Sequence, residues 1–134
     1  MRPRIAQEFT AVKARYPDIV HMEHGGEDWF LLPRYSCPQG WEIDGSPKST
    51  LAIAFRLGAA YPQGEPYGFA TAAKITFKGA APQSAGSSCP CPFEGDWQQF
   101  SWAPDDWTPT DDIHDGSNML AWVRSFVVRL KEGA

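Results

Sequence analysis

The sequence predicts an α+β domain in which an antiparallel sheet is flanked by a helix at each end of the chain. Apolar side chains recur at helical spacing in residues 3–16 and 119–130, whereas residues 50–57 alternate between large apolar and small or charged side chains. This separation of helices from strands along the chain is typical of an α+β fold with a strand meander. Because 134 residues fit one domain and no repeat or linker divides them, we expect a single domain over residues 1–134.

The first element is a predicted helix over residues 3–16. Pro3 suits a first helical turn, and Pro17 disfavours helical geometry in the residue before it. The apolar face consists of Ile5, Phe9, Val12 and Tyr16, and the opposite, polar side is expected to carry Gln7, Glu8, Lys13 and Arg15. We expect this face to pack against the rest of the domain.

Two short strand-like runs follow, residues 19–24 and 28–32, and a Gly-Gly turn between them favours a hairpin. His21 and His24 lie three residues apart, so on a strand their side chains point to opposite faces. That spacing argues against a shared metal ion, and we predict no metal site.

The middle of the chain alternates loop and strand. Residues 33–49 are expected to be mostly loop, residues 50–57 form the clearest strand, and residues 67–77 offer a less regular one. The segment between those strands, residues 58–66, cannot continue a ladder because its prolines lack a backbone donor. With the hairpin, these strands make a predicted four-stranded meander, and a long loop follows over residues 78–96.

The last third of the chain combines aromatic, polar and acidic residues. Trp97, Trp102 and Trp107 lie in a stretch rich in turn formers, which we expect to pack as a rigid loop because large aromatic side chains bury much surface. The closing helix has its apolar residues at helical spacing: Met119, Trp122, Val123, Phe126, Val127 and Leu130. A rigid loop that displays polar groups at the foot of a helix is the predicted location of a functional site.

Composition argues against several classes of protein. The net charge is -4 and no basic stripe is present, which argues against a nucleic-acid partner. No apolar run approaches the roughly 18 to 20 residues of a membrane span, and the N-terminus lacks the apolar segment of a signal peptide. The three cysteines cannot all pair with one another, so without an export signal we expect reduced thiols in the cytoplasm.

Two motifs resemble those of the ubiquitin-conjugating enzyme (UBC) family. Tyr61-Pro62 follows the clearest strand, and Trp107-Thr108-Pro109 comes just before the closing helix, as a Tyr-Pro turn and a Trp-x-Pro motif do in that family. The run Gly95-x-Trp97-Gln98-x-Phe100-Ser101, followed by Asp111-Asp112, is similar to a bacterial branch found in antiphage-defence operons with genes for a ubiquitin-like protein, an activating enzyme and a peptidase. The resemblance implies a UBC-like fold over nearly the whole chain.

The resemblance implies a carrier that accepts the C-terminal acyl group of a ubiquitin-like protein from an activating enzyme and transfers it to a target amine. Its implied partners are those two proteins and a deconjugating peptidase of the same operon, and no cofactor is implied. The activating enzyme is expected to dock on the N-terminal helix, whose exposed face carries Arg4, Lys13 and Arg15. The alternative is a catalytically inactive UBC-fold adaptor that binds the activating enzyme or the ubiquitin-like protein.

The chain departs from the family pattern in the catalytic loop. It has no His-Pro-Asn tripeptide, and its single asparagine is Asn118, so the asparagine that stabilises the oxyanion in the family has no counterpart. The bacterial branch commonly has Ser-Arg-His-Trp where this chain has Ser101-Trp102-Ala103-Pro104. Backbone N–H groups or the Trp97 and Trp102 indoles would have to stabilise an oxyanion instead.

Ser101 is the first candidate for the acyl acceptor. Residues 98–101 correspond to the family's cysteine position, and Ser101 is their only hydroxyl. A serine forms an oxyester and needs a base to activate it. The candidate bases in the sequence are Asp105, Asp106 and His114.

Cys89 and Cys91 are the competing nucleophiles. They lie upstream in a Cys-Pro-Cys run, and a thiolate reacts more readily than a hydroxyl near neutral pH. Neighbouring Glu94 and Asp96 would raise the thiol pKa values. Cys37 would add a third thiolate for a zinc ion, but a fourth ligand and the usual C-x-x-C spacing are absent, so no metal site is predicted.

Five residues are predicted to form a binding surface: Trp97, Trp102, Trp107, Asp111 and Asp112. A deep apolar pocket lined by the three indoles would indicate a third class of function, an unrelated small-molecule-binding domain. A flat surface would argue against that class.

Overall fold

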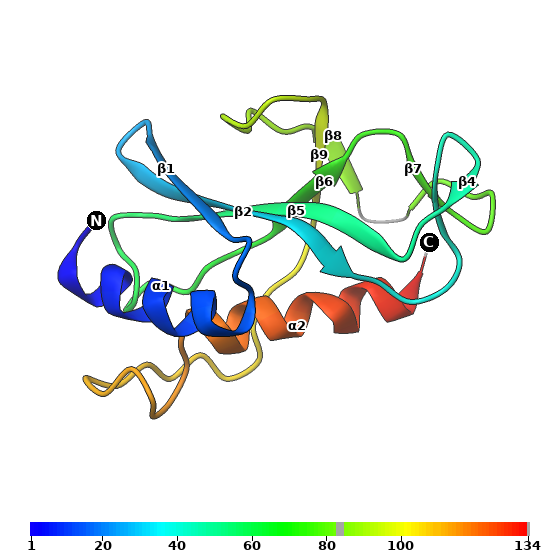
Figure 1. The fold of residues 1–134 in the computed structure, drawn as a ribbon. Helices are drawn as coiled ribbons and strands as arrows, with labels where there is room; N and C mark the ends of the chain where they lie inside the picture. The colour runs from blue at the N-terminus through cyan, green and yellow to red at the C-terminus, as the bar shows by residue number, and fades with distance from the viewer. Residues whose placement is uncertain (83–84, 134) are drawn as a thin grey trace.

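Both helices lie on the same side of the main antiparallel sheet (Figure 1). The computed structural model describes residues 1–82 and 85–133. Helix α1 spans Pro3–Arg15 and helix α2 spans Met119–Glu132, so the two predicted helices are confirmed. Neither helix of the described chain has the length and apolar character that crossing a bilayer requires.

The described residues form two antiparallel sheets. The larger has the strand order β1-β2-β5-β6-β9-β8. In that order the strands are Val20–His24, Glu27–Ser36, Thr50–Leu57, Phe69–Ala72, Trp97–Phe100 and Ala85–Ser88. The smaller has the order β4-β3-β7, made of Ser46–Pro47, Trp41–Ile43 and Ile75–Phe77. The predicted hairpin and the strand over residues 50–57 are both confirmed.

Over the described residues the main sheet has six strands, two more than the predicted four-stranded meander. Strands β1, β2, β5 and β6 follow one another across the sheet, but β9 then pairs with β6 and β8 pairs with β9, where only loop was predicted. Trp97 and Phe100 of β9 are buried and the two glutamines between them are half-buried, so the strand does not alternate. Four residues bounded by turn formers are too few to show a strand period in the sequence. Residues 83 and 84 of the predicted loop lie outside the described residues.

Two other predicted boundaries are wrong. The single strand expected over residues 67–77 is divided by a turn at Ala73 and Lys74, so β6 belongs to the main sheet and β7 pairs with β3. The loop expected over residues 33–49 contains β3, β4 and the end of β2. Strand β2 continues past Pro33 through a register shift, which accommodates the missing N–H of the proline.

Alternation along the strands creates an apolar cluster on each face of the main sheet. Phe30 of β2 belongs to the helix-side cluster and its neighbour Trp29 to the opposite, outer cluster. Strand β5 contributes four fully buried side chains to the helix side, Leu51, Ile53, Phe55 and Leu57. Helix α2 closes this core with Phe126, whose ring centroid lies 4.6 Å from that of Phe69.

The outer cluster is covered by the segment that joins β8 to β9 (Figure 1). Phe93 of this segment packs with Trp97 of β9 over Trp29 and two small residues of the sheet. The Trp97 indole Nε1 donates a hydrogen bond of 3.1 Å to the Phe93 carbonyl oxygen, which fixes the segment to the strand. Part of the outer face of the sheet is therefore closed by the chain itself.

Replacing Phe126 with alanine is expected to lower the free energy of unfolding by about 3 to 5 kcal/mol, because the ring is fully buried between α2 and the sheet. Denaturant unfolding measures the change. The matched control is Val128→Ala on the same helix, where the side chain is 50 % exposed and the expected loss is about 0.5 kcal/mol or less. A loss below about 1 kcal/mol for Phe126→Ala would contradict the packing described.

Candidate functional site

A buried carboxylate connects α1 to the two segments that carry the Tyr-Pro and Trp-x-Pro motifs. The side chain of Glu8 is only 1 % exposed. Its Oε1 accepts hydrogen bonds of 2.6 Å from the Tyr61 hydroxyl and 2.6 Å from the backbone N–H of Met119. Its Oε2 accepts a 2.7 Å hydrogen bond from Arg4 Nε. Because Met119 is the first residue of α2, the carboxylate also lies at the positive end of that helix.

The two motifs also contact each other directly. The Trp107 indole Nε1 donates a 2.7 Å hydrogen bond to the carbonyl oxygen of Pro62, and the rings of Tyr61 and Trp107 lie 5.7 Å apart. Arg4 donates from Nη1 to the carbonyl oxygen of Thr110. The turn after β5 and the loop before α2 are therefore held together on one side of α1.

Ser101 is exposed at the point where the chain leaves the sheet. Phe100 before it is fully buried. Trp102 after it is fixed twice: its indole Nε1 donates to Ser125 Oγ at 3.0 Å, and its carbonyl oxygen accepts from the N–H of Gly68 at 2.7 Å. Ser101 is therefore displayed between two anchored residues, and no hydrogen bond to its hydroxyl is found among the described residues.

The candidate bases are not brought to Ser101 by any described contact. Asp105 and Asp106 are exposed in the loop that follows it. His114 lies elsewhere, in a shallow depression between the loop and α1. The other residues lining that depression are Gln7, Thr10, Ala11, Asp111, Asp112 and Ile113. Asp111 and Asp112, which were predicted to belong to the binding surface, therefore lie against α1 together with His114.

The Cys89 and Cys91 thiols are half-buried against the outer cluster. Burial raises the pKa of Cys89, and the positive charge of Arg56 lowers it only in part. Burial likewise raises the pKa of Cys91; a backbone hydrogen bond from Phe93 opposes this rise, and the nearby Cys89 adds to it. Both thiols are therefore poor sources of thiolate near neutral pH.

Cys37 is separated from the other two thiols by the main sheet. It packs against the helix-side cluster, and its Sγ contacts the carbonyl oxygen of Lys48 at 3.4 Å. Cys89 and Cys91 lie on the opposite face. In residues 1–82 and 85–133, no three His, Cys, Asp or Glu side chains form a cluster able to hold a metal ion.

The three tryptophans do not line a common pocket. Trp97 packs in the outer cluster, whereas Trp102 and Trp107 pack on the helix side of the sheet. Each indole N–H already donates to a protein acceptor, namely the Phe93 carbonyl, Ser125 Oγ and the Pro62 carbonyl. The Trp97 and Trp102 indoles are therefore not free to stabilise an oxyanion, and a pocket formed by the three indoles is absent from the described chain.

The placement of Glu8 on the polar side of α1 was wrong, because its side chain is buried with those of Ile5 and Val12. The sequence contained the signal, since Glu8 lies at helical spacing between these two apolar residues. An acidic residue on a buried helical face needs partners, and Arg4 lies one turn earlier in the correct position to supply one.

No protein-family model, no curated protein and no solved structure matches this chain.

Replacing Glu8 with alanine is expected to lower the free energy of unfolding by about 3 to 5 kcal/mol, because it leaves Arg4, the Tyr61 hydroxyl and the Met119 N–H without their shared partner. Thermal or denaturant unfolding gives the value. The neighbouring Gln7→Ala variant, at an exposed position of the same helix, should change stability by about 0.5 kcal/mol or less. Equal effects of the two substitutions would show that Glu8 does not connect the segments.

Cys89 and Cys91 are expected to react with iodoacetamide more slowly in the folded chain than in the unfolded chain at pH 8. The raised pKa leaves each thiol protonated, so the rate should still be rising above the ordinary thiol value of 9.0. Peptide mapping by mass spectrometry follows each cysteine separately. Equal rates in the folded and unfolded chains would mean that the thiols are neither buried nor suppressed.

Proposed function

We propose that this chain is a UBC-like carrier that accepts a ubiquitin-like protein from an activating enzyme and transfers it to a target amine, with Ser101 as the acyl acceptor. The observation that supports the proposal best is the hydrogen bond from the Trp107 indole to the Pro62 carbonyl, together with the tilted packing of the Trp107 ring against that of Tyr61. Two motifs that resemble the family meet in space although 45 residues separate them in the sequence.

The proposed chemistry has two acyl transfers. In the first, Ser101 Oγ attacks the carbonyl carbon of the thioester that joins the ubiquitin-like protein to its activating enzyme. A C–O bond forms, the C–S bond breaks, and the serine proton passes to the departing thiolate by way of a base. In the second, a target amine attacks the carbonyl carbon of the oxyester, a C–N bond forms, the C–O bond breaks, and the amine proton passes to Ser101 Oγ. The exposure of Ser101 supports access by both reactants.

The base that activates Ser101 comes from Asp105, Asp106 or the activating enzyme in the loaded complex, because no described residue hydrogen-bonds to the Ser101 hydroxyl. Accessibility favours Ser101 over either thiol as the acceptor, because Ser101 is exposed whereas Cys89 and Cys91 are half-buried against the outer cluster.

A second candidate is a catalytically inactive adaptor on the same UBC-like fold, which binds the activating enzyme or the ubiquitin-like protein without accepting the acyl group. The specific observation in its favour is that all three indole N–H groups near Ser101 are already engaged and no base contacts its hydroxyl. In both candidates the docking surface for the activating enzyme is α1. Lys13 and Arg15 of this helix form no ion pair within the described residues, whereas Arg4 is bound to Glu8 and to the Thr110 carbonyl.

A charging assay distinguishes the two candidates. The chain is incubated with ATP and the activating enzyme and ubiquitin-like protein of its operon, and adducts are read by intact mass. A carrier that uses Ser101 gives an adduct that survives thiol reductant, is cleaved by hydroxylamine and disappears in Ser101→Ala. Ser49→Ala, at another exposed serine, is the matched control and should charge normally.

Other outcomes would change the assignment. An adduct that is cleaved by reductant and lost in Cys89→Ser or Cys91→Ser would reject Ser101 and place the acyl group on a thiol. The absence of any adduct, with binding to the activating enzyme retained in calorimetry, would reject the carrier and support the adaptor. The absence of both charging and binding would reject the UBC-like proposal.

A further inference from the structure

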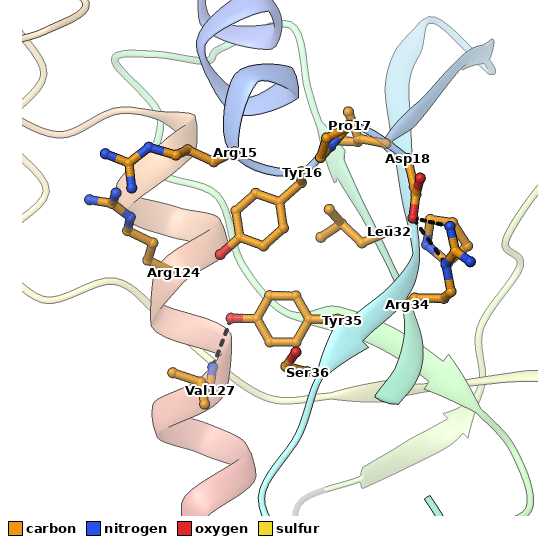
Figure 2. Close-up of a pocket in the computed structure, with 12 residues that line it drawn as sticks. Arg15, Tyr16, Pro17, Asp18, Leu32, Arg34, Tyr35, Ser36, Arg124 and Val127 are labelled. Atoms are coloured by element: carbon orange, nitrogen blue, oxygen red, sulfur yellow. Dashed lines mark hydrogen bonds and ion pairs between the residues drawn. The ribbon is translucent and has the colours of Figure 1, made fainter. Parts of the chain in front are cut away.

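A pocket lies between the carboxyl end of α1, strand β2 and helix α2 (Figure 2). Its volume of about 470 Å³ falls within the roughly 300 to 1,000 Å³ typical of small-molecule sites. None of the candidate nucleophiles and bases lines it, although Arg15 also belongs to the proposed docking surface on α1. The concave space itself is a feature of the fold that the proposed acyl transfer does not use.

The pocket has an apolar and preformed wall. Leu32 is buried at its base and Val127 borders it from α2. The rings of Tyr16 and Tyr35 are stacked with centroids 5.9 Å apart and planes 11° apart. The Tyr35 hydroxyl donates to the carbonyl oxygen of Val123 at 2.7 Å and accepts from the N–H of Val127 at 3.1 Å, so its ring is fixed against α2.

Tyr35 contributes no negative charge to this wall. Burial raises the pKa of Tyr35, and the neighbouring Tyr16 raises it further, so the phenol remains neutral. A flat, uncharged aromatic surface of this kind suits the flat apolar body of a ligand.

The charged residues at the pocket are mostly cations. Its lining contains three arginines and one aspartate, a net charge of +2 in a chain of net charge -4. The aspartate, Asp18, is already bound by Arg34 through Nε at 3.0 Å and through Nη2. Arg15 and Arg124 are exposed and take part in no ion pair of the described chain. In Figure 2 both guanidinium groups extend to the same side of the two tyrosine rings.

The helix dipole stabilises the positive charge of only one of these two arginines. Arg15 is the last residue of α1, where a positive charge is stabilised by the helix dipole. Arg124 lies in the amino-terminal half of α2, where the dipole gives a cation no such stabilisation. Two like charges that border one pocket repel each other, and a bound anion would neutralise that repulsion.

We propose that this pocket binds a small organic anion, whose flat apolar body packs against Tyr16, Tyr35 and Leu32 and whose carboxylate or sulfonate is held by Arg15 and Arg124. Binding of this ligand needs none of the candidate nucleophiles or bases and shares only Arg15 with the proposed docking surface on α1. The apolar wall supplies affinity for the body of the ligand, and the two guanidinium groups supply selectivity for its charge.

The test uses two fluorescent probes that differ by one charged group. 8-Anilinonaphthalene-1-sulfonate carries the anion, and N-phenyl-1-naphthylamine is the same ring system without it. The anionic probe should bind one site in the folded chain. Its dissociation constant should rise about fivefold in Arg124→Gln and further in Arg15→Gln/Arg124→Gln, as expected for loss of exposed charge-assisted contacts. Affinity for the neutral probe should stay the same in all variants.

The matched control is Lys131→Gln, which removes one exposed positive charge from α2 away from the pocket and should leave both affinities within about twofold of the parent chain. Amide shifts in two-dimensional NMR spectra should concentrate at Tyr16, Leu32 and Val127. The proposal is overturned if the double variant binds the anionic probe as tightly as the parent, if Lys131→Gln weakens it equally, or if the shifts lie elsewhere. Thermal unfolding establishes that each variant is folded.

Discussion

The arrangement of the elements depends on the buried carboxylate of Glu8. Removing a carboxylate from water costs several kcal/mol, and the cost is offset only where charge and hydrogen bonds replace the lost solvent. Arg4, the Tyr61 hydroxyl and the first N–H of α2 provide that replacement. Since these groups come from α1, from the turn after β5 and from α2, one buried charge fixes three segments at once. Arg4 extends the connection through Thr110 into the loop that precedes α2.

The tryptophans position the candidate site rather than line it. Trp97 anchors strand β9 in the outer cluster, whereas Phe100 and Trp102, on either side of Ser101, both pack on the helix side of the sheet. Ser101 is therefore held between two anchored residues and exposed without help from neighbouring polar groups. That geometry serves a carrier and an adaptor equally well, because each needs a fixed surface for a partner. The two differ in the base, which the described contacts do not provide.

Elements with several complete periods were predictable from the sequence. Both helices and strand β5 repeat their pattern over 8 residues or more, so the period is unambiguous. Strands β3, β4, β7 and β9 have 2 to 4 residues each, and tertiary pairing alone defines them. The motif around Ser101 could be found because its residues are adjacent. The partners of Glu8 could not, since Tyr61 and Met119 lie 53 and 111 residues away.

The strand order of the main sheet has a consequence for synthesis of the chain. Strand β9 is the last strand to leave the ribosome, yet it lies in the interior of the sheet, between β6 and β8. Until residue 100 has been made, strand β6 has one edge without a partner strand. Phe69 then also lacks the Phe100 ring that packs beside it in the complete fold. An open strand edge with apolar side chains invites pairing with another nascent chain. Translation speed across residues 73–100 therefore sets how long each molecule remains prone to aggregation.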